Sequence, residues 1–154
     1  MTTLTKKLVS AMLSLAVLTT FVSGAFAASA SKQIITSDGT IIELGVETTD
    51  SSVQPRVRSL LNETLNGQQS YTAEFTCVKS AGSNMKFSIK NTGTSVINVS
   101  AYCNGEFLAD YSVPAGETSN TTANKPGGLT SSFTFYMNAA SSSGMYCEIK
   151  AEQY

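Results

Sequence analysis

Apolar and polar residues alternate along several short segments of this 154-residue chain, and this alternation constrains the fold more than any other feature. Segments 71–77, 85–90 and 133–137 carry an apolar side chain at every second position. Such residues share one face of a β-strand, so each segment is predicted to be a half-buried strand. Six or seven such strands, separated by turn residues, predict an all-β antiparallel sandwich, with a small β-barrel as the alternative.

Residues 1–30 have the organisation of a secretory signal peptide. Lys6 and Lys7 precede an apolar run over residues 8–22, and small residues follow at 25–30. An apolar run this short, with these flanks, favours a cleaved signal over a membrane anchor. We therefore expect a secreted, extracellular protein that begins at Ala28 or Ser31 and has no membrane association after cleavage.

The composition excludes several classes of function. Without the signal, eight basic residues face eleven acidic ones, which argues against nucleic acid as a partner. The chain has no histidine, which excludes Ser-His-Asp and Cys-His catalysis and imidazole-bound zinc. Glu106 and Asp110 lie about 13 Å apart on one predicted strand, too far for a glycosidase pair. We expect no enzyme, no metal and no cofactor.

Residues 31–67 precede the predicted sandwich domain, which covers residues 68–154. Within the polar segment 31–54, an Asp38-Gly39 turn between two isoleucine-rich runs predicts a hairpin. Residues 55–67 carry apolar side chains at helical spacing, with Pro55 near the start and Gly67 past the end. This pattern favours a short amphipathic helix, and the alternative is an irregular segment or linker laid across the end of the sandwich.

Turn residues predict three hairpins within the sandwich domain. A three-residue loop ends in Gly82, a second covers residues 103–105, and the third joins the last two strands. A two-residue Asn104-Gly105 turn is the alternative for the second hairpin, but in a regular ladder it would pair Val99 with Asp110 and bury that carboxylate. A weak further strand is expected over residues 118–123. The predicted cross-strand pairs are Phe75 with Phe87, Ala101 with Phe107, and Met137 with Met145.

Two turn motifs carry a resemblance to a known class of proteins. Residues 87–94 read F-S-I-K-N-T-G-T, and residues 113–118 read V-P-A-G-E-T. Together with the signal peptide and Gln54-Pro55-Arg56, these motifs resemble small secreted bacterial proteins that have an immunoglobulin-like β-sandwich and no assigned function. The resemblance covers about half of the chain after the signal. It implies an immunoglobulin-like fold and carries over no catalytic residue.

Three cysteines in a secreted chain allow at most one internal bridge. In an up-and-down arrangement, Cys77 and Cys103 lie at the same end of the sandwich, and Cys147 lies towards the other end. We therefore predict a Cys77–Cys103 disulfide and a buried Cys147 thiol. The alternative is that all three remain reduced and act as small core residues.

Tyr136 and Tyr146 are the best candidates for a binding site. With the apolar residues of the final hairpin buried, both tyrosines are expected to point outward and opposite each other. Two exposed rings on one sheet face form a platform for a sugar or a peptide, with Glu148 and Lys150 as polar contacts further along. The alternative is a cross-strand aromatic pair that only stabilises the sheet.

These observations predict a non-catalytic protein that acts through its surface. Its expected partner is a cell-wall or host glycan, or an extracellular protein. One alternative is a structural or matrix protein that assembles through exposed strand edges. Another is a secreted effector precursor that a trypsin-like protease processes at Arg56 or Arg58, because both arginines lie in a polar, exposed segment.

Overall fold

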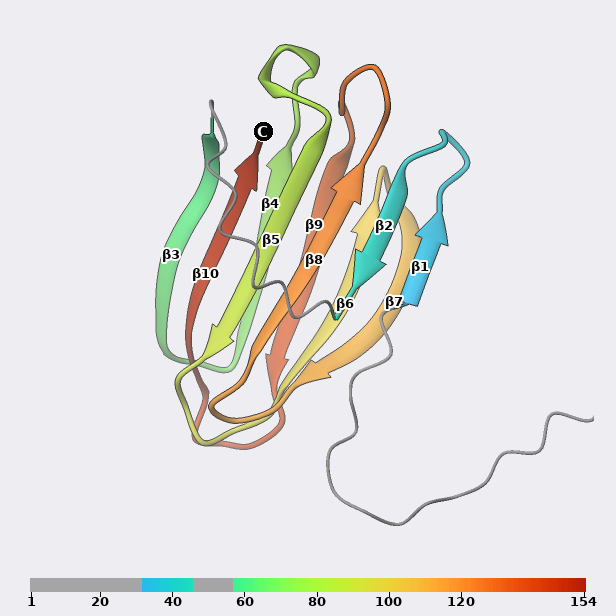
Figure 1. The fold of residues 1–154 in the computed structure, drawn as a ribbon. Helices are drawn as coiled ribbons and strands as arrows, with labels where there is room; N and C mark the ends of the chain where they lie inside the picture. Colours follow the sequence, from blue (N-terminus) through green and yellow to red (C-terminus); the bar gives the residue numbers. More distant parts are fainter. Residues whose placement is uncertain (1–31, 46–56) are drawn as a thin grey trace, which may run out of the picture.

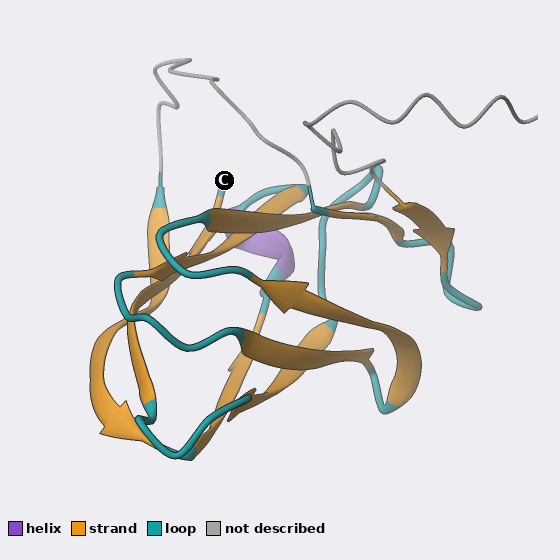
Figure 2. Ribbon diagram, turned by 90° about the horizontal axis from the view of Figure 1, so that it is seen from below, coloured by secondary structure: helices purple, strands orange, loops and turns teal. Residues whose placement is uncertain are grey.

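Two antiparallel sheets stack face to face in the computed structural model, which describes residues 32–45 and 57–154 (Figures 1 and 2). The strands are β1 (Lys32–Ile35), β2 (Ile41–Leu44), β3 (Arg58–Gln68), β4 (Ser70–Thr76), β5 (Asn84–Asn91), β6 (Ile97–Cys103), β7 (Glu106–Val113), β8 (Thr118–Asn124), β9 (Ser132–Ala139) and β10 (Met145–Gln153). A single 3-10 turn, η1 (Lys79–Ala81), interrupts the described strands. No helix in the described ranges is long and apolar enough to span a membrane.

One sheet has six strands in the order β1-β2-β8-β5-β10-β3, and the other has four in the order β4-β9-β6-β7. Every strand pairing is antiparallel, so the all-β sandwich is confirmed and the closed barrel is not. The described residues contain ten strands rather than six or seven, because the N-terminal hairpin and residues 58–68 both join the six-stranded sheet. The predicted signal peptide lies outside the described residues.

The core is built by the alternation that the sequence predicts. Inward residues of β4, β5 and β9 are buried, and four phenylalanines from these strands meet between the sheets. The rings of Phe87 and Phe135 stack across the two sheets with their centroids 4.1 Å apart. Phe75 contacts both rings and also Phe133. This aromatic cluster joins the two layers.

Two of the three predicted hairpins are wrong, although the buried faces of their strands are right. β4 belongs to the four-stranded sheet and β5 to the six-stranded sheet, and the same division separates β9 from β10. Phe75 and Phe87 therefore face each other across the core and not along a hairpin. The connections at residues 77–83 and 140–144 are long enough to cross the roughly 10 Å between packed sheets.

The hairpin of β6 and β7 forms, but its register differs from the prediction. Cys103 pairs with Glu106 across a two-residue Asn104-Gly105 turn, and Asn104 adopts the positive φ of 51° that such a turn requires. A bulge between Ala101 and Tyr102 then shifts the register, so Ala101 pairs with Ala109 rather than Phe107. The bulge keeps Asp110 on the outer face. The two-residue turn therefore forms without burying this carboxylate.

Residues 58–68 form strand β3 and not the predicted helix. The strand pairs along its length with β10, with Leu61 and Leu65 on the inward side and Glu63 between them. In the sequence, the carboxylate of Glu63 interrupts the series of apolar residues at alternate positions, so the strand pattern is not visible there. The side chain of Glu63 accepts a 2.6 Å hydrogen bond from the hydroxyl of Tyr71 on β4, so it ties the two sheets together. Burial, and then this carboxylate, raise the pKa of Tyr71 to about 12.

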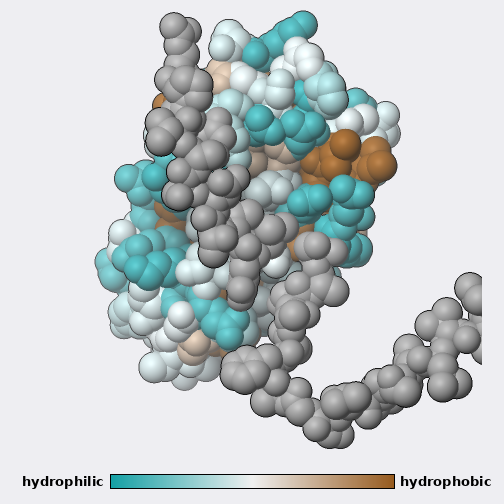
Figure 3. Space-filling view, viewed as in Figure 1, coloured by the Kyte–Doolittle hydropathy of each residue, from teal (hydrophilic) through white to brown (hydrophobic). Residues whose placement is uncertain are grey.

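The outer face of the six-stranded sheet is mostly hydrophilic (Figure 3). β5 and β10 present lysine and glutamate side chains there, including the Lys90–Glu148 pair at 3.4 Å. The apolar colour on this view gathers at the β1–β2 hairpin, where Ile35 is exposed. This face therefore offers mainly polar and charged groups to solvent, and its largest apolar area lies at the β1–β2 edge of the sheet.

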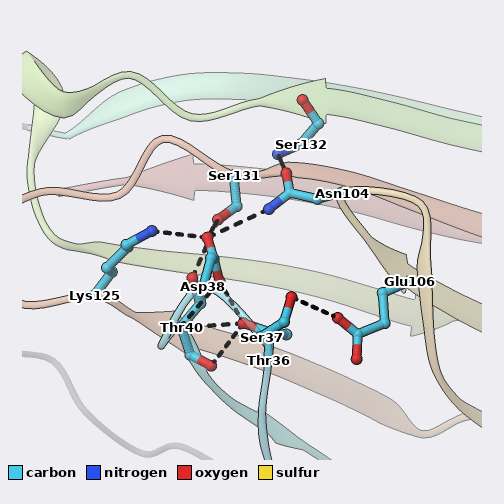
Figure 4. A network of polar contacts seen from close by, with 9 residues as sticks. All are labelled: Thr36, Ser37, Asp38, Thr40, Asn104, Glu106, Lys125, Ser131 and Ser132. Atoms are coloured by element: carbon cyan, nitrogen blue, oxygen red, sulfur yellow. Dashed lines mark hydrogen bonds and ion pairs between the residues drawn. The ribbon is translucent and has the colours of Figure 1, made fainter.

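The predicted N-terminal hairpin is confirmed, and a polar network holds its turn against the body of the sandwich (Figure 4). Asp38, at the tip, pairs with Lys125 at 2.7 Å and accepts hydrogen bonds from Ser131 and Asn104. The hydroxyl of Thr36 also donates to Asp38. β2 then pairs with β8, and Ile42 is fully buried. The hairpin is thus an integral part of the six-stranded sheet.

We predict that Phe87→Ala lowers the free energy of unfolding by about 3–5 kcal/mol, because it removes the ring that stacks across the sheets and leaves a cavity. Urea denaturation measures this loss. Phe107→Ala is the matched control: its ring is 53% exposed, so its loss should stay below about 1 kcal/mol. Equal losses for the two variants would contradict the described core.

We predict that the Asp38 network makes stability depend on acid pH. The hydrogen bond from Lys125, followed by that from Thr36, holds the pKa of Asp38 well below its ordinary value of 3.8. Folding therefore favours the charged carboxylate, and its contribution is complete above that value and declines as the pH falls below it. Asp38→Asn should flatten the loss of stability between about pH 4 and pH 2. Urea denaturation at several pH values tests this, and superimposable pH profiles would refute it.

Candidate functional site

The structure separates the two tyrosines that the sequence places together. Tyr136 lies on β9 and Tyr146 on β10, so their side chains point outward from opposite faces of the sandwich. The predicted two-tyrosine platform is therefore wrong, because it rested on a β9–β10 hairpin that does not form. Both tyrosines are exposed as predicted, at 45% and 44% respectively.

Tyr146 has close contacts that give it a structural role. A Cβ added at Gly67 would lie 3.3 Å from the Tyr146 hydroxyl oxygen, and one at Gly93 would lie 3.1 Å from the Tyr146 Cβ. Tyr146 thus packs over Gly67 and Gly93, where a larger residue would clash with it. Glu148 and Lys150 share this face, as predicted, but each is in an ion pair, with Lys90 and Glu152 respectively. These three residues are therefore partly occupied by contacts within the sheet.

Tyr136 instead belongs to a row of aromatic residues on the outer face of the four-stranded sheet. The ring centroid of Tyr102 on β6 lies 5.5 Å from that of Tyr136 and 5.4 Å from that of Phe107 on β7. The interplanar angles are 86° and 66°, so neighbouring rings meet edge to face and form a stepped surface. We call this outer face, with Tyr102, Phe107 and Tyr136, the aromatic face.

Polar side chains lie beside the rings on the aromatic face. A shallow hollow next to Tyr136 is lined by side chains of three neighbouring strands, namely Asn98, Ser100, Asp110, Ser112 and Asn138. Ser100 donates a 2.6 Å hydrogen bond to Asp110, and Ser112 donates one of 3.0 Å to Asn98. Neither Tyr102 nor Tyr136 uses its hydroxyl in a hydrogen bond to any described residue. Amides, hydroxyls and a carboxylate therefore lie beside the aromatic rings, and the two tyrosine hydroxyls have no partner among the described residues.

The sequence contained part of the signal for this face. The alternation of β6 places Tyr102 outward with Asn98 and Ser100, so its place on the outer face, where it is half-buried, could have been found. Phe107 could not, because the predicted register turned it inward, whereas the bulge turns it out and buries Leu108 and Ala109 instead. The meeting of all three rings also requires β6 and β9 to be neighbours, which no local pattern indicates.

All three cysteines are buried free thiols, and the predicted Cys77–Cys103 disulfide is absent. The sheet order explains why. β9 lies between β4 and β6, so Cys77 and Cys103 are separated by two strand spacings, roughly 9.5 Å, whereas a bridge needs Cα atoms within about 7 Å. Burial raises the pKa of Cys77 to about 12 and that of Cys147 to about 11. Buried thiols with raised pKa values are poor nucleophiles.

The remaining candidates offer no assembled reaction centre. Among the described residues, no three cysteine, aspartate or glutamate side chains gather as they would around a metal ion. Glu106 accepts a hydrogen bond from Ser37, and Asp110 accepts one from Ser100, so each contacts a different hydroxyl. Arg58 is exposed at the start of β3, paired with Gln153, and Arg56 lies outside the described residues. Processing at either arginine stays a prediction.

Comparisons with known proteins add little to this geometry. No protein-family model and no curated protein matches the chain. Among solved structures, two crystal structures of an exo-β-1,3-galactanase from Phanerochaete chrysosporium with β-1,3-galactotriose are similar, at 12% and 14% identity and TM-scores of 0.37 and 0.38. They match 74% of this chain but only 32% and 33% of theirs, about a third of the galactanase. At this level of similarity they do not bear on function.

We predict that the native protein reacts slowly with thiol reagents and that denaturation exposes three thiols per chain without reductant. Burial of the three side chains and their raised pKa values both protect them in the native state. Counting alkylated cysteines by mass spectrometry, before and after addition of guanidinium chloride, tests this. A single alkylated thiol after denaturation would show that the other two cysteines form a disulfide.

Proposed function

We propose that this protein is a secreted, non-catalytic module that binds a glycan chain on the aromatic face. The observation that carries the proposal is the row of Tyr102, Phe107 and Tyr136 beside a hollow of amide, hydroxyl and carboxylate groups. A sugar ring has apolar C–H faces and polar edges. Exposed aromatic rings pack against such faces, and neighbouring polar side chains hydrogen-bond the hydroxyls.

The stepped arrangement of the rings favours one glycan chain over a flat crystalline surface. Because adjacent rings meet at 86° and 66°, the three cannot all lie against one plane. Each ring instead offers its surface to a different sugar unit of a chain that crosses β9, β6 and β7. The face therefore suits soluble or amorphous polysaccharide.

Binding to a panel of amorphous polysaccharides and soluble oligosaccharides tests the proposal. Co-sedimentation finds the polysaccharide that retains the protein, and calorimetry then measures its affinity. The double variant Tyr102→Ala/Tyr136→Ala should lose roughly tenfold or more in affinity, the usual cost of removing anchoring aromatic side chains. Circular dichroism confirms that the variant is folded.

Tyr146→Ala is the matched control, because Tyr146 is as exposed as Tyr136 but lies on the other sheet. It should leave the affinity unchanged while lowering stability, since its ring covers Gly67. Loss of binding in Tyr146→Ala alone would move the site to the other face. Failure of every glycan in the panel to bind the wild type would reject the glycan function.

A further inference from the structure

The four strands that form the aromatic face carry negative charge and no positive charge. Glu74, Glu106 and Asp110 lie on β4 and β7, and these four strands contain no lysine or arginine. Every lysine or arginine of the described residues lies on the six-stranded sheet, in η1 or in the β8–β9 loop: Lys32, Arg58, Lys79, Lys86, Lys90, Lys125 and Lys150. Among the described residues, the four-stranded sheet is thus negatively charged, whereas the six-stranded sheet carries both signs, with Glu43, Glu63, Glu148 and Glu152 beside its basic residues.

Two of these carboxylates lie on either side of Tyr136. On one side, Tyr136 pairs with Thr72, and Glu74 is the next outward residue along β4. On the other side, Tyr136 and Asp110 both pair with Ser100, which places them two strand spacings apart, roughly 9.5 Å. Both carboxylates are exposed, and neither has a cationic partner among the described residues.

We infer that the aromatic face selects glycans by charge and prefers chains with free amino groups, such as glucosamine oligomers. This inference rests on the proposed glycan function and deepens it. A protonated sugar amine above the ring of Tyr136 gains a cation–π contact, and amines on the neighbouring sugar units face Glu74 and Asp110 on the adjoining strands. A uronate in the same place meets two like charges and no cation. Asn98, Asn138 and Ser112 supply hydrogen bonds to ring hydroxyls, which favours a sugar over a lysine-rich peptide.

Calorimetry with three oligomers of equal length tests the inference: glucosamine, N-acetylglucosamine and galacturonate hexamers. Acetylation removes the charge from the amine but keeps the sugar ring. The wild type should bind the glucosamine hexamer roughly 2- to 30-fold more tightly than the acetylated one, the range expected for two exposed ion pairs. It should bind the galacturonate hexamer most weakly. The preference should shrink in 1 M salt, where the Debye length is about 3 Å.

The double variant Glu74→Gln/Asp110→Asn removes both charges and keeps the side-chain shapes. Its preference for the glucosamine hexamer over the N-acetylglucosamine hexamer should be smaller than that of the wild type, because only the cation–π contact with Tyr136 then distinguishes the two oligomers. Glu148→Gln is the matched control, because it removes one exposed carboxylate from the opposite sheet, and it should preserve the preference. A lysine hexapeptide provides the comparison with a cationic peptide.

Three results would overturn the inference. The first is equal binding of the two glucosamine-type hexamers to the wild type, which leaves a neutral-glycan function intact. The second is a preference that is as large in the double variant as in the wild type. The third is a lysine hexapeptide bound as tightly as the glucosamine hexamer, which would make the partner a cationic peptide. If no glycan of the wider panel binds, the proposed function itself fails.

Discussion

The stacking of Phe87 on Phe135 is the contact on which the rest of the structure depends. It joins the central strands of two sheets that share no backbone hydrogen-bond ladder, and Phe75 and Phe133 extend the same cluster. Since a hairpin or a sheet alone is marginal in water, burial between the layers holds both of them in place. Tyr71 with Glu63, and Tyr111 with Thr121, then link the two sheets on either side of this cluster.

The sequence predicted which side of each strand is buried but not which strands are neighbours. Alternation in β4, β5 and β9 identified their inward residues correctly, because it reflects only the exposure of each side chain. Phe75 facing Phe87 is compatible with a hairpin and with opposite sheets, and nothing local distinguishes the two. The existence of the N-terminal hairpin was predictable because Asp38-Gly39 is a turn signal between two isoleucine-rich runs, and Gly39 adopts the positive φ of 79° that the turn requires.

The errors concentrate where one polar residue or one bulge alters the pattern. The helix over residues 55–67 was predicted from apolar residues at helical spacing, and Glu63, which is exposed between Leu61 and Leu65, breaks the strand alternation that would have corrected it. The hydrogen-bond partner of Glu63 is Tyr71 on a different strand. The bulge after Ala101 turns Phe107 outward, and Phe107 is one of the three rings of the aromatic face. The candidate site therefore was only partly predictable: Tyr136 was found from alternation, whereas its neighbours required the sheet order.

The separation of β9 and β10 into opposite sheets underlies the proposed site, because it places Tyr136 on the aromatic face and Tyr146 on the opposite face. Spin labels at Tyr136→Cys and Tyr146→Cys test it directly, since the native thiols are buried and react slowly. The sandwich predicts labels more than about 20 Å apart, because they point outward from sheets roughly 10 Å apart. Strong dipolar broadening from labels within about 10 Å would show paired strands and contradict the account.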